Sequence, residues 1–249
     1  MMIRPLLFCC LCGVACARDQ AVKPAAVRRA AGDAHAVAPA VDTADPPIPD
    51  SILRRVAAFG DSLAHDGTGA RAATWLWMLG RLTQTSLGSV PGTGHYGAYA
   101  KAHPEQYSYS EPDAEFVYNG FHFAELVRRF PQDTLADRAG YALTNLGIVG
   151  ECEGDVACNI GRELFPLRTF LARFPSSPLA RNAILRVNIA FDSTLAYSPG
   201  PRDAWEVDST AIRAEIAGYD STAQTLPPAL RALATPTIER LRERWKVPP

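Results

Sequence analysis

The sequence RFPQDTLADRA at residues 129–139 returns 44 positions later as RFPSSPLARNA at residues 173–183, with six of the eleven positions identical. In each copy an apolar segment ends at a phenylalanine, and the proline that follows it stops a helix. A polar residue, Asp133 or Ser177, then stands where it can cap the next helix. The repeat therefore predicts one helix–turn–helix unit that occurs twice in the chain.

Helical periodicity extends well beyond this repeat, and no strand alternation of useful length is visible. One segment, residues 114–130, places five residues on a single helix face at steps of three and four: Phe116, Gly120, Phe123, Val127 and Phe130. The complete set of predicted helical segments is 51–65, 70–84, 114–130, 134–147, 160–174, 178–192, 208–222 and 228–246. The sequence thus predicts an all-α fold of stacked antiparallel helix pairs. Small residues in the repeat are expected where paired helices approach closely, namely Ala136, Ala139, Ala180 and Ala183.

The Phe-Pro turn between two amphipathic helices resembles that of tetratricopeptide repeats. It is particularly similar to those of periplasmic proteins such as the lipoprotein of the outer-membrane barrel-assembly machinery and the Tol-associated coordinators. The resemblance covers about 75 residues, from Ala114 to about Ala190. It departs from the family in its 44-residue spacing, against about 34 in a standard repeat, and in lacking the Trp and Gly-Tyr signature of the first helix. The resemblance implies a solenoid whose concave surface binds another protein or a peptide.

The N-terminus has the pattern of an export signal over residues 1–17. Arg4 supplies a positive start, and the apolar run 5–15 is too short to span a bilayer. Signal peptidase would cut after Ala17. Alternatively, the sequence Gly-Val-Ala-Cys that ends at Cys16 resembles a bacterial lipobox with glycine in place of the usual leucine, and Cys16 would then be lipidated. Both alternatives place the protein in the periplasm or anchored to the outer membrane.

The predicted organisation has three parts: the signal at 1–17, a linker at 18–50 and a helical-repeat domain at 51–249. The linker is rich in Ala, Pro, Val and Asp and offers neither a helical face nor strand alternation. Across the whole chain 25 basic residues balance 26 acidic ones, for a formal net charge of −1. This balance gives no electrostatic basis for binding nucleic acid.

Two of the six cysteines lie outside the signal region, at Cys152 and Cys158. In an oxidising compartment so close a pair predicts a disulfide. The acidic residues around it do not match a calcium loop, because Val156 and Arg162 stand where an EF-hand needs glycine and glutamate. No metal or cofactor site is expected.

The sequence FGDSL at residues 59–63 resembles the first block of GDSL (SGNH) esterases, in which Ser62 would be the nucleophile. A serine nucleophile needs a histidine base with an orienting carboxylate. The family's Asp-x-x-His block is missing, and no histidine follows His122. The same residues fit a helix face, with Ile52 and Leu63 at its ends. We expect a helix here, and keep a serine esterase as the alternative function.

Residues 88–113 form the longest segment without periodicity, and loops of this length are often functional. Four tyrosines make it a candidate surface for a partner, or for carbohydrate or cell-wall binding: Tyr96, Tyr99, Tyr107 and Tyr109. The alternative is that these side chains seal the loop onto the helices. The sequence as a whole predicts an exported, non-enzymatic scaffold that binds another envelope protein or peptide.

Overall fold

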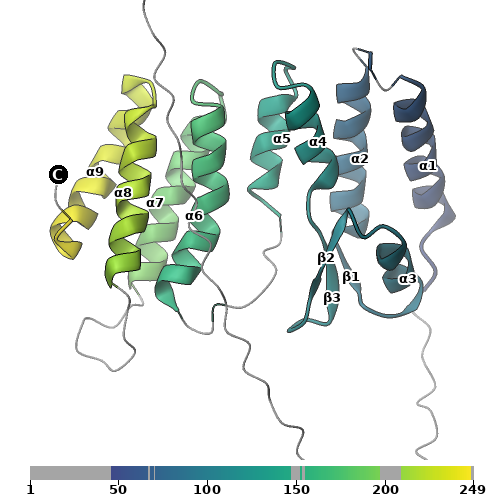
Figure 1. Cartoon of the computed structure of the whole chain (residues 1–249), viewed down its shortest axis with the longest axis horizontal. Coiled ribbons are helices and arrows are strands. Elements are labelled where there is room, and N and C mark those ends of the chain that lie inside the picture. Colours follow the sequence, from purple (N-terminus) through teal and green to yellow (C-terminus); the bar gives the residue numbers. More distant parts are fainter. Residues whose placement is uncertain are drawn as a thin grey trace, which may run out of the picture. The chain divides into compact units, whose positions relative to one another are not determined.

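The computed structural model describes residues 46–66, 68–69, 71–146, 152, 155–196 and 209–247. Within these ranges the chain forms nine helices and one three-stranded sheet (Figure 1). The predominantly helical class predicted from the sequence is confirmed. The predicted signal peptide, with Cys16, and most of the predicted linker lie outside the described residues. The fold includes Ile48, which is buried just ahead of the first helix.

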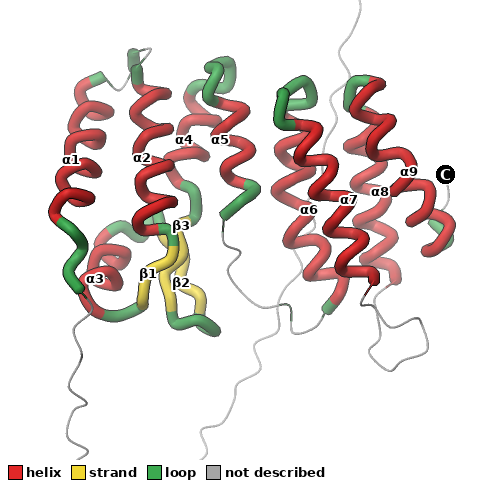
Figure 2. Tube along the Cα trace, turned by 180° about the vertical axis from the view of Figure 1, so that it is seen from behind, coloured by secondary structure: helices red, strands yellow, loops and turns green. Residues whose placement is uncertain are grey.

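Eight of the described helices form four consecutive antiparallel pairs that lie side by side in chain order (Figures 1 and 2). The pairs are α1 (Asp50–His65) with α2 (Ala72–Leu87), α4 (Phe121–Arg129) with α5 (Ala136–Leu143), α6 (Val156–Arg173) with α7 (Ala180–Ala196), and α8 (Ser209–Gln224) with α9 (Pro228–Trp245). Neighbouring pairs touch through α2 and α4, α5 and α6, α6 and α8, and α7 and α9.

The two copies of the repeat fold into the same turn. Phe130 ends α4 with φ −129° and ψ 55°, and Phe174 ends α6 with φ −128° and ψ 57°. The carbonyls of these phenylalanines accept hydrogen bonds from the N–H groups of Asp133 (3.0 Å) and Ser177 (3.1 Å). The sequence identity therefore reports a shared backbone conformation.

The polar residue of each turn shapes the entry to the second helix. The Asp133 carboxylate accepts a hydrogen bond from the Leu135 N–H at 2.8 Å, and the Ser177 hydroxyl accepts one from the Leu179 N–H at 3.1 Å. These are the local side chain-to-backbone turns that Asp and Ser favour. The four alanines predicted to allow close approach are all buried, each at 1% exposure or less: Ala136, Ala139, Ala180 and Ala183.

The first three pairs meet where a glycine of one pair faces an aromatic ring of the next. A Cβ added at Gly80 of α2 would lie 2.5 Å from the Phe123 ring of α4. A Cβ added at Gly140 of α5 would lie 2.6 Å from the Phe174 ring at the end of α6. Neither site has room for a methyl group, so these two glycines set how closely the pairs approach.

The core consists of two clusters of buried side chains. One is built from the sheet and the helices up to α5, and the other from α6 to α9. Phe174 packs against both clusters. Polar contacts also connect the second and third helix pairs here. Ser177 donates its hydroxyl proton to the Asp137 carboxylate at 2.7 Å, and Arg173 donates to the Val127 carbonyl at 2.6 Å.

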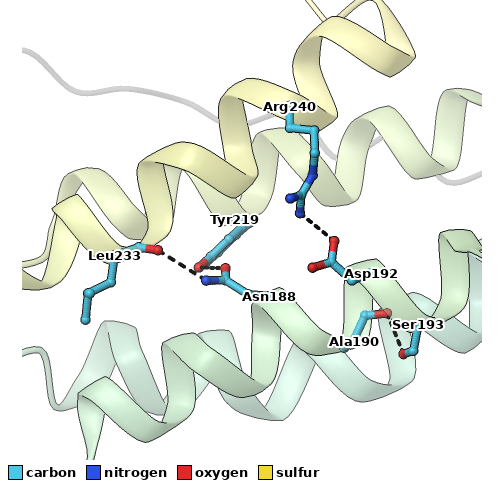
Figure 3. Close-up of polar contacts among 7 residues, drawn as sticks. All are labelled: Asn188, Ala190, Asp192, Ser193, Tyr219, Leu233 and Arg240. Carbon is cyan, nitrogen blue, oxygen red and sulfur yellow. Dashed lines mark hydrogen bonds and ion pairs between the residues drawn. The ribbon is translucent and has the colours of Figure 1, made fainter.

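A polar network fixes α7, α8 and α9 to one another (Figure 3). The Asn188 amide of α7 donates to the Leu233 carbonyl of α9 at 3.1 Å, and its carbonyl oxygen accepts the Tyr219 hydroxyl of α8 at 2.8 Å. At the surface, Arg240 of α9 pairs with Asp192 of α7. Each helix of the last pair is therefore tied to α7 at a defined position.

A small sheet and an extra helix stand between α2 and α4, and they correct two sequence predictions. The segment 88–113 contains β1 (Ser89–Pro91), α3 (Gly94–Ala102) and β2 (Tyr107–Ser110), so it is not a structureless loop. The predicted helix 114–130 is also wrong in its first half, which is β3 (Glu115–Tyr118). Strand β3 lies in the middle of the sheet and pairs antiparallel with β1 and β2.

Gly120 explains why this helix prediction failed. It adopts φ 83° and ψ 17°, a left-handed conformation that ends the extended strand and starts α4. Phe116 and Phe123, assigned from their spacing to one helix face, lie on either side of this break, in β3 and α4. A four-residue strand is too short for its alternation to be distinguished from helical spacing.

We expect Gly80→Ala to destabilise the protein and Gly60→Ala to stabilise it. Both changes add a methyl group in mid-helix, where alanine is favoured over glycine by about 1 kcal/mol. At Gly60 no atom lies within 4 Å of the new Cβ, whereas at Gly80 the methyl must displace the fully buried Phe123 ring. Such overpacking costs about 1–3 kcal/mol. Urea unfolding of the two variants measures the difference, and equal midpoints would contradict the close approach of α2 and α4.

Candidate functional site

A cavity of about 570 Å³ opens between α2, α5 and the turn that precedes α7. Its walls combine aromatic, cationic and small polar side chains, and the helices that carry them are visible in Figure 2. We call it the α2–α5 groove. The residues that line it are Trp77, Arg81, Thr134, Asp137, Arg138, Tyr141, Ala142, Asn145, Pro178 and Leu179.

Two aromatic side chains of the α2–α5 groove are anchored in the core. Trp77 is half-buried, with its ring 5.5 Å from that of Phe123. Tyr141 is half-buried as well, with its ring 5.4 Å from that of Phe170. Because each ring is held by a core neighbour, the groove presents preformed apolar surface, as small-molecule and peptide sites commonly do.

Arginines line or flank the same groove. Arg81 lies over the Trp77 ring at 5.8 Å, and Arg186 of α7 lies over the Tyr141 ring at 5.8 Å. Arg186 also donates hydrogen bonds to the Thr144 hydroxyl at 2.7 Å and the Thr144 carbonyl at 2.8 Å. It therefore ties the end of α5 to α7 and holds one wall of the groove in place.

A second cavity of about 420 Å³ lies between the C-terminal end of α5 and the pair α6–α7. Its lining includes Arg162, Glu163 and Pro166 from α6, together with Ile189 of α7, which is 64% exposed. No aromatic side chain of the described residues lines it. The α2–α5 groove is therefore the stronger candidate for recognition.

The four tyrosines singled out in the sequence lie around α3 and the sheet, away from both cavities. Tyr107 is 5% exposed, and its ring lies 6.3 Å from that of Tyr99. Tyr96 and Tyr99 are half-buried, whereas Tyr109 is 47% exposed and packs against Phe116. Most of this aromatic surface packs α3 and β2 against the core, which supports the alternative that these tyrosines hold the segment 88–113 onto the helices.

Tyr118 and His122 form a buried polar pair beneath these tyrosines. The Tyr118 hydroxyl lies 3.1 Å from His122 Nδ1 and accepts a hydrogen bond from the His122 N–H. Burial raises the pKa of Tyr118 and lowers that of His122 to about 4. At neutral pH this histidine is therefore uncharged, and it belongs to the core.

Ser62 lies inside α1, as the helical interpretation expected, and not at the end of a strand. Its hydroxyl donates to the Ala58 carbonyl at 2.8 Å, a common arrangement for serine within a helix. The proton that a catalytic base would remove is thus directed at the backbone. The four residues of the predicted face are all partly covered: Ile52, Val56, Phe59 and Leu63.

Cys152 and Cys158 form the predicted disulfide, with an S–S distance of 2.07 Å. Cys158 belongs to the first turn of α6, so the bridge ties the chain that enters this helix to the helix itself. Asp155 caps α6 and accepts the Ala157 N–H at 2.8 Å and the Cys158 N–H at 3.1 Å. Its carboxylate stabilises the helix end, and the acidic neighbours Glu151 and Glu153 lie outside the described residues.

The part of the chain that the structure describes contains no cluster of three or more metal-ligating side chains. Among those same residues, no helix is long and apolar enough to cross a membrane. Comparison of the chain with protein-family models, curated proteins and solved structures finds no match.

Sequence reasoning did not find the α2–α5 groove. A signal was present, because Trp77 and Arg81 are four residues apart and Arg138 and Tyr141 are three apart, spacings that place each pair on one face of its helix. What the sequence did not contain was the contact that brings these two helix faces together.

We expect the stability of the protein to fall as the pH is lowered from 7 to 5. The pKa of His122 is lower in the folded state than the usual 6.5, so the unfolded state binds the proton first. Over this range the loss amounts to about 2 kcal/mol. The pKa values of Glu105 and Glu125 are lowered from 4.5, so their contributions are lost at more acidic pH. Urea unfolding at both pH values measures the loss of stability, which should be smaller in the His122→Gln variant. Equal losses in the two proteins would show that a group other than His122 causes the pH dependence.

We expect a fluorophosphonate probe not to label the protein at Ser62. The hydroxyl is bonded to the backbone of its own helix, and a serine without a base is a weak nucleophile. Mass spectrometry after incubation with the probe tests this, with Ser62→Ala as the matched control. Stoichiometric labelling that disappears in Ser62→Ala would establish the esterase alternative.

Proposed function

We propose that this chain is an exported helical-repeat scaffold, similar to envelope tetratricopeptide-repeat proteins, that binds another protein or peptide of the cell envelope. The solenoid architecture is part of the proposal. Four consecutive helix pairs and a turn that occurs twice with the same hydrogen bonds support it. The export pattern of residues 1–17 and the disulfide support the location.

The observation that carries the binding function is the α2–α5 groove. Trp, Tyr and Arg are the residues that dominate the energetics of protein interfaces, and here Trp77, Arg81, Arg138 and Tyr141 line one cavity. The two rings are held by core contacts, so a ligand would lose little entropy in ordering them.

Site-specific photocrosslinking in the native envelope tests the proposal. A photoreactive amino acid at Thr134 or Asn145, both exposed and both lining the groove, should yield a discrete adduct with a partner protein or peptide. The same group at the exposed Asp61 of α1, outside the groove, is the control.

Trp77→Ala should abolish the adduct formed at Asn145 while the protein remains folded by circular dichroism, because it removes the aromatic wall. Adducts of equal yield from the groove and from Asp61, or adducts unaffected by Trp77→Ala, would contradict a partner site in this groove.

A further inference from the structure

We propose that the α2–α5 groove selects an extended peptide segment in which acidic residues stand beside large apolar side chains. This inference rests on the proposed binding function and adds the chemistry of the ligand. It follows from the charges that line the groove, from the rings between them, and from the spacing of both along the two helices.

Arg81 and Arg138 have no carboxylate partner within the described ranges of the chain. The Arg81 guanidinium donates to the Gln84 amide oxygen at 3.2 Å and lies over the Trp77 ring, and both of these partners are neutral. Arg138 is exposed and forms neither a hydrogen bond nor an ion pair with any residue that the structure describes. Two positive charges therefore border the groove, and neither is paired with a carboxylate among the described residues.

Among the residues that line the groove, Asp137 is the one carboxylate, and it has a structural contact. Asp137 accepts the Ser177 hydroxyl at 2.7 Å, a contact that helps to hold the two copies of the repeat together. Arg186, whose guanidinium lies over Tyr141, is bound to the end of α5 and supports the wall. Two arginines and one carboxylate line the groove, so its lining keeps a net positive charge, and the complement of an unpaired guanidinium is a carboxylate.

The apolar part of the ligand follows from the rings and from Leu179 at the turn before α7. Trp77 and Tyr141 offer rigid aromatic surface, on which leucine-sized or aromatic side chains gain the most area. Each wall alternates ring and cation within about one helical turn, Trp77 with Arg81 and Tyr141 with Arg138. Neighbours at this spacing lie about 5–6 Å apart, close to the roughly 7 Å between same-side residues of an extended chain.

Selection from a random decapeptide library displayed on phage tests the inference, with the full chain as bait. We expect enrichment of sequences that combine Asp or Glu with Leu, Phe or Trp. A synthetic peptide of the enriched sequence, labelled with fluorescein, should bind with an affinity that falls as the salt concentration rises, because the arginines are exposed.

Charge reversal identifies the groove as the site. The double variant Arg81→Glu, Arg138→Glu should weaken binding of that peptide at least tenfold and should select basic peptides from the same library. Arg55→Glu, on the exposed side of α1 and outside the groove, is the matched control and should leave affinity within twofold. Should the double variant not fold by circular dichroism, the single variants Arg81→Gln and Arg138→Gln should each weaken binding about threefold.

The outcomes separate the two proposals. Enriched peptides without acidic residues, or an affinity that neither arginine variant changes, would overturn the acidic ligand while leaving peptide binding in place. A library that yields no binding peptide would overturn both the ligand chemistry and peptide binding by this groove.

Discussion

The contact between Phe174 and Gly140 is the constraint on which the arrangement of this molecule depends. Phe174 ends α6, packs against both hydrophobic clusters, and lies where α5 leaves no room for a methyl group. Hydrophobic burial is non-directional, so it cannot by itself specify how two helix pairs meet. A ring that packs against a glycine does specify how the pairs meet, because a close-packed interior tolerates little displacement. The hydrogen bond from the Ser177 hydroxyl to the Asp137 carboxylate adds a directional polar contact between the same two helix pairs.

The α2–α5 groove is a consequence of this stacking. Gly80 allows α4 to pack closely against α2, and the Phe-Pro turn places α5 beside α4. The contact of Phe174 with Gly140 then brings the turn before α7 close to α5. Three elements that are distant in sequence thereby line one cavity. Its side chains are of the kinds that recognise partners, whereas the tyrosines around α3 mainly fill the core. The proposed recognition surface thus lies between helix pairs, whereas the sheet contributes to the core.

The helix pairs were predictable because their signals are local. The repeat, the Phe-Pro corners and the buried alanines all depend on residues within one turn or one helix face, and the structure confirms them. The disulfide was predictable for the same reason, since its cysteines are six residues apart. The sheet was missed because its strands have three or four residues and are paired by contacts across the chain. The helix predicted over 114–130 failed at Gly120, whose left-handed conformation has no signature in the spacing of apolar residues.

By itself, the amino-acid sequence determined the helical class, the position of most helices and the lack of the Asp-x-x-His block that GDSL esterases use. These conclusions rest on periodicity, on proline and on the residue types that catalysis requires, all of which are properties of the chain before it folds. The tertiary structure alone decided which helix faces meet, that Tyr107 lies in the core and that Trp77 lines a cavity with Arg138. The physical reason is that burial and groove formation depend on contacts between residues far apart in sequence, which the spacing of residues within one helix does not encode.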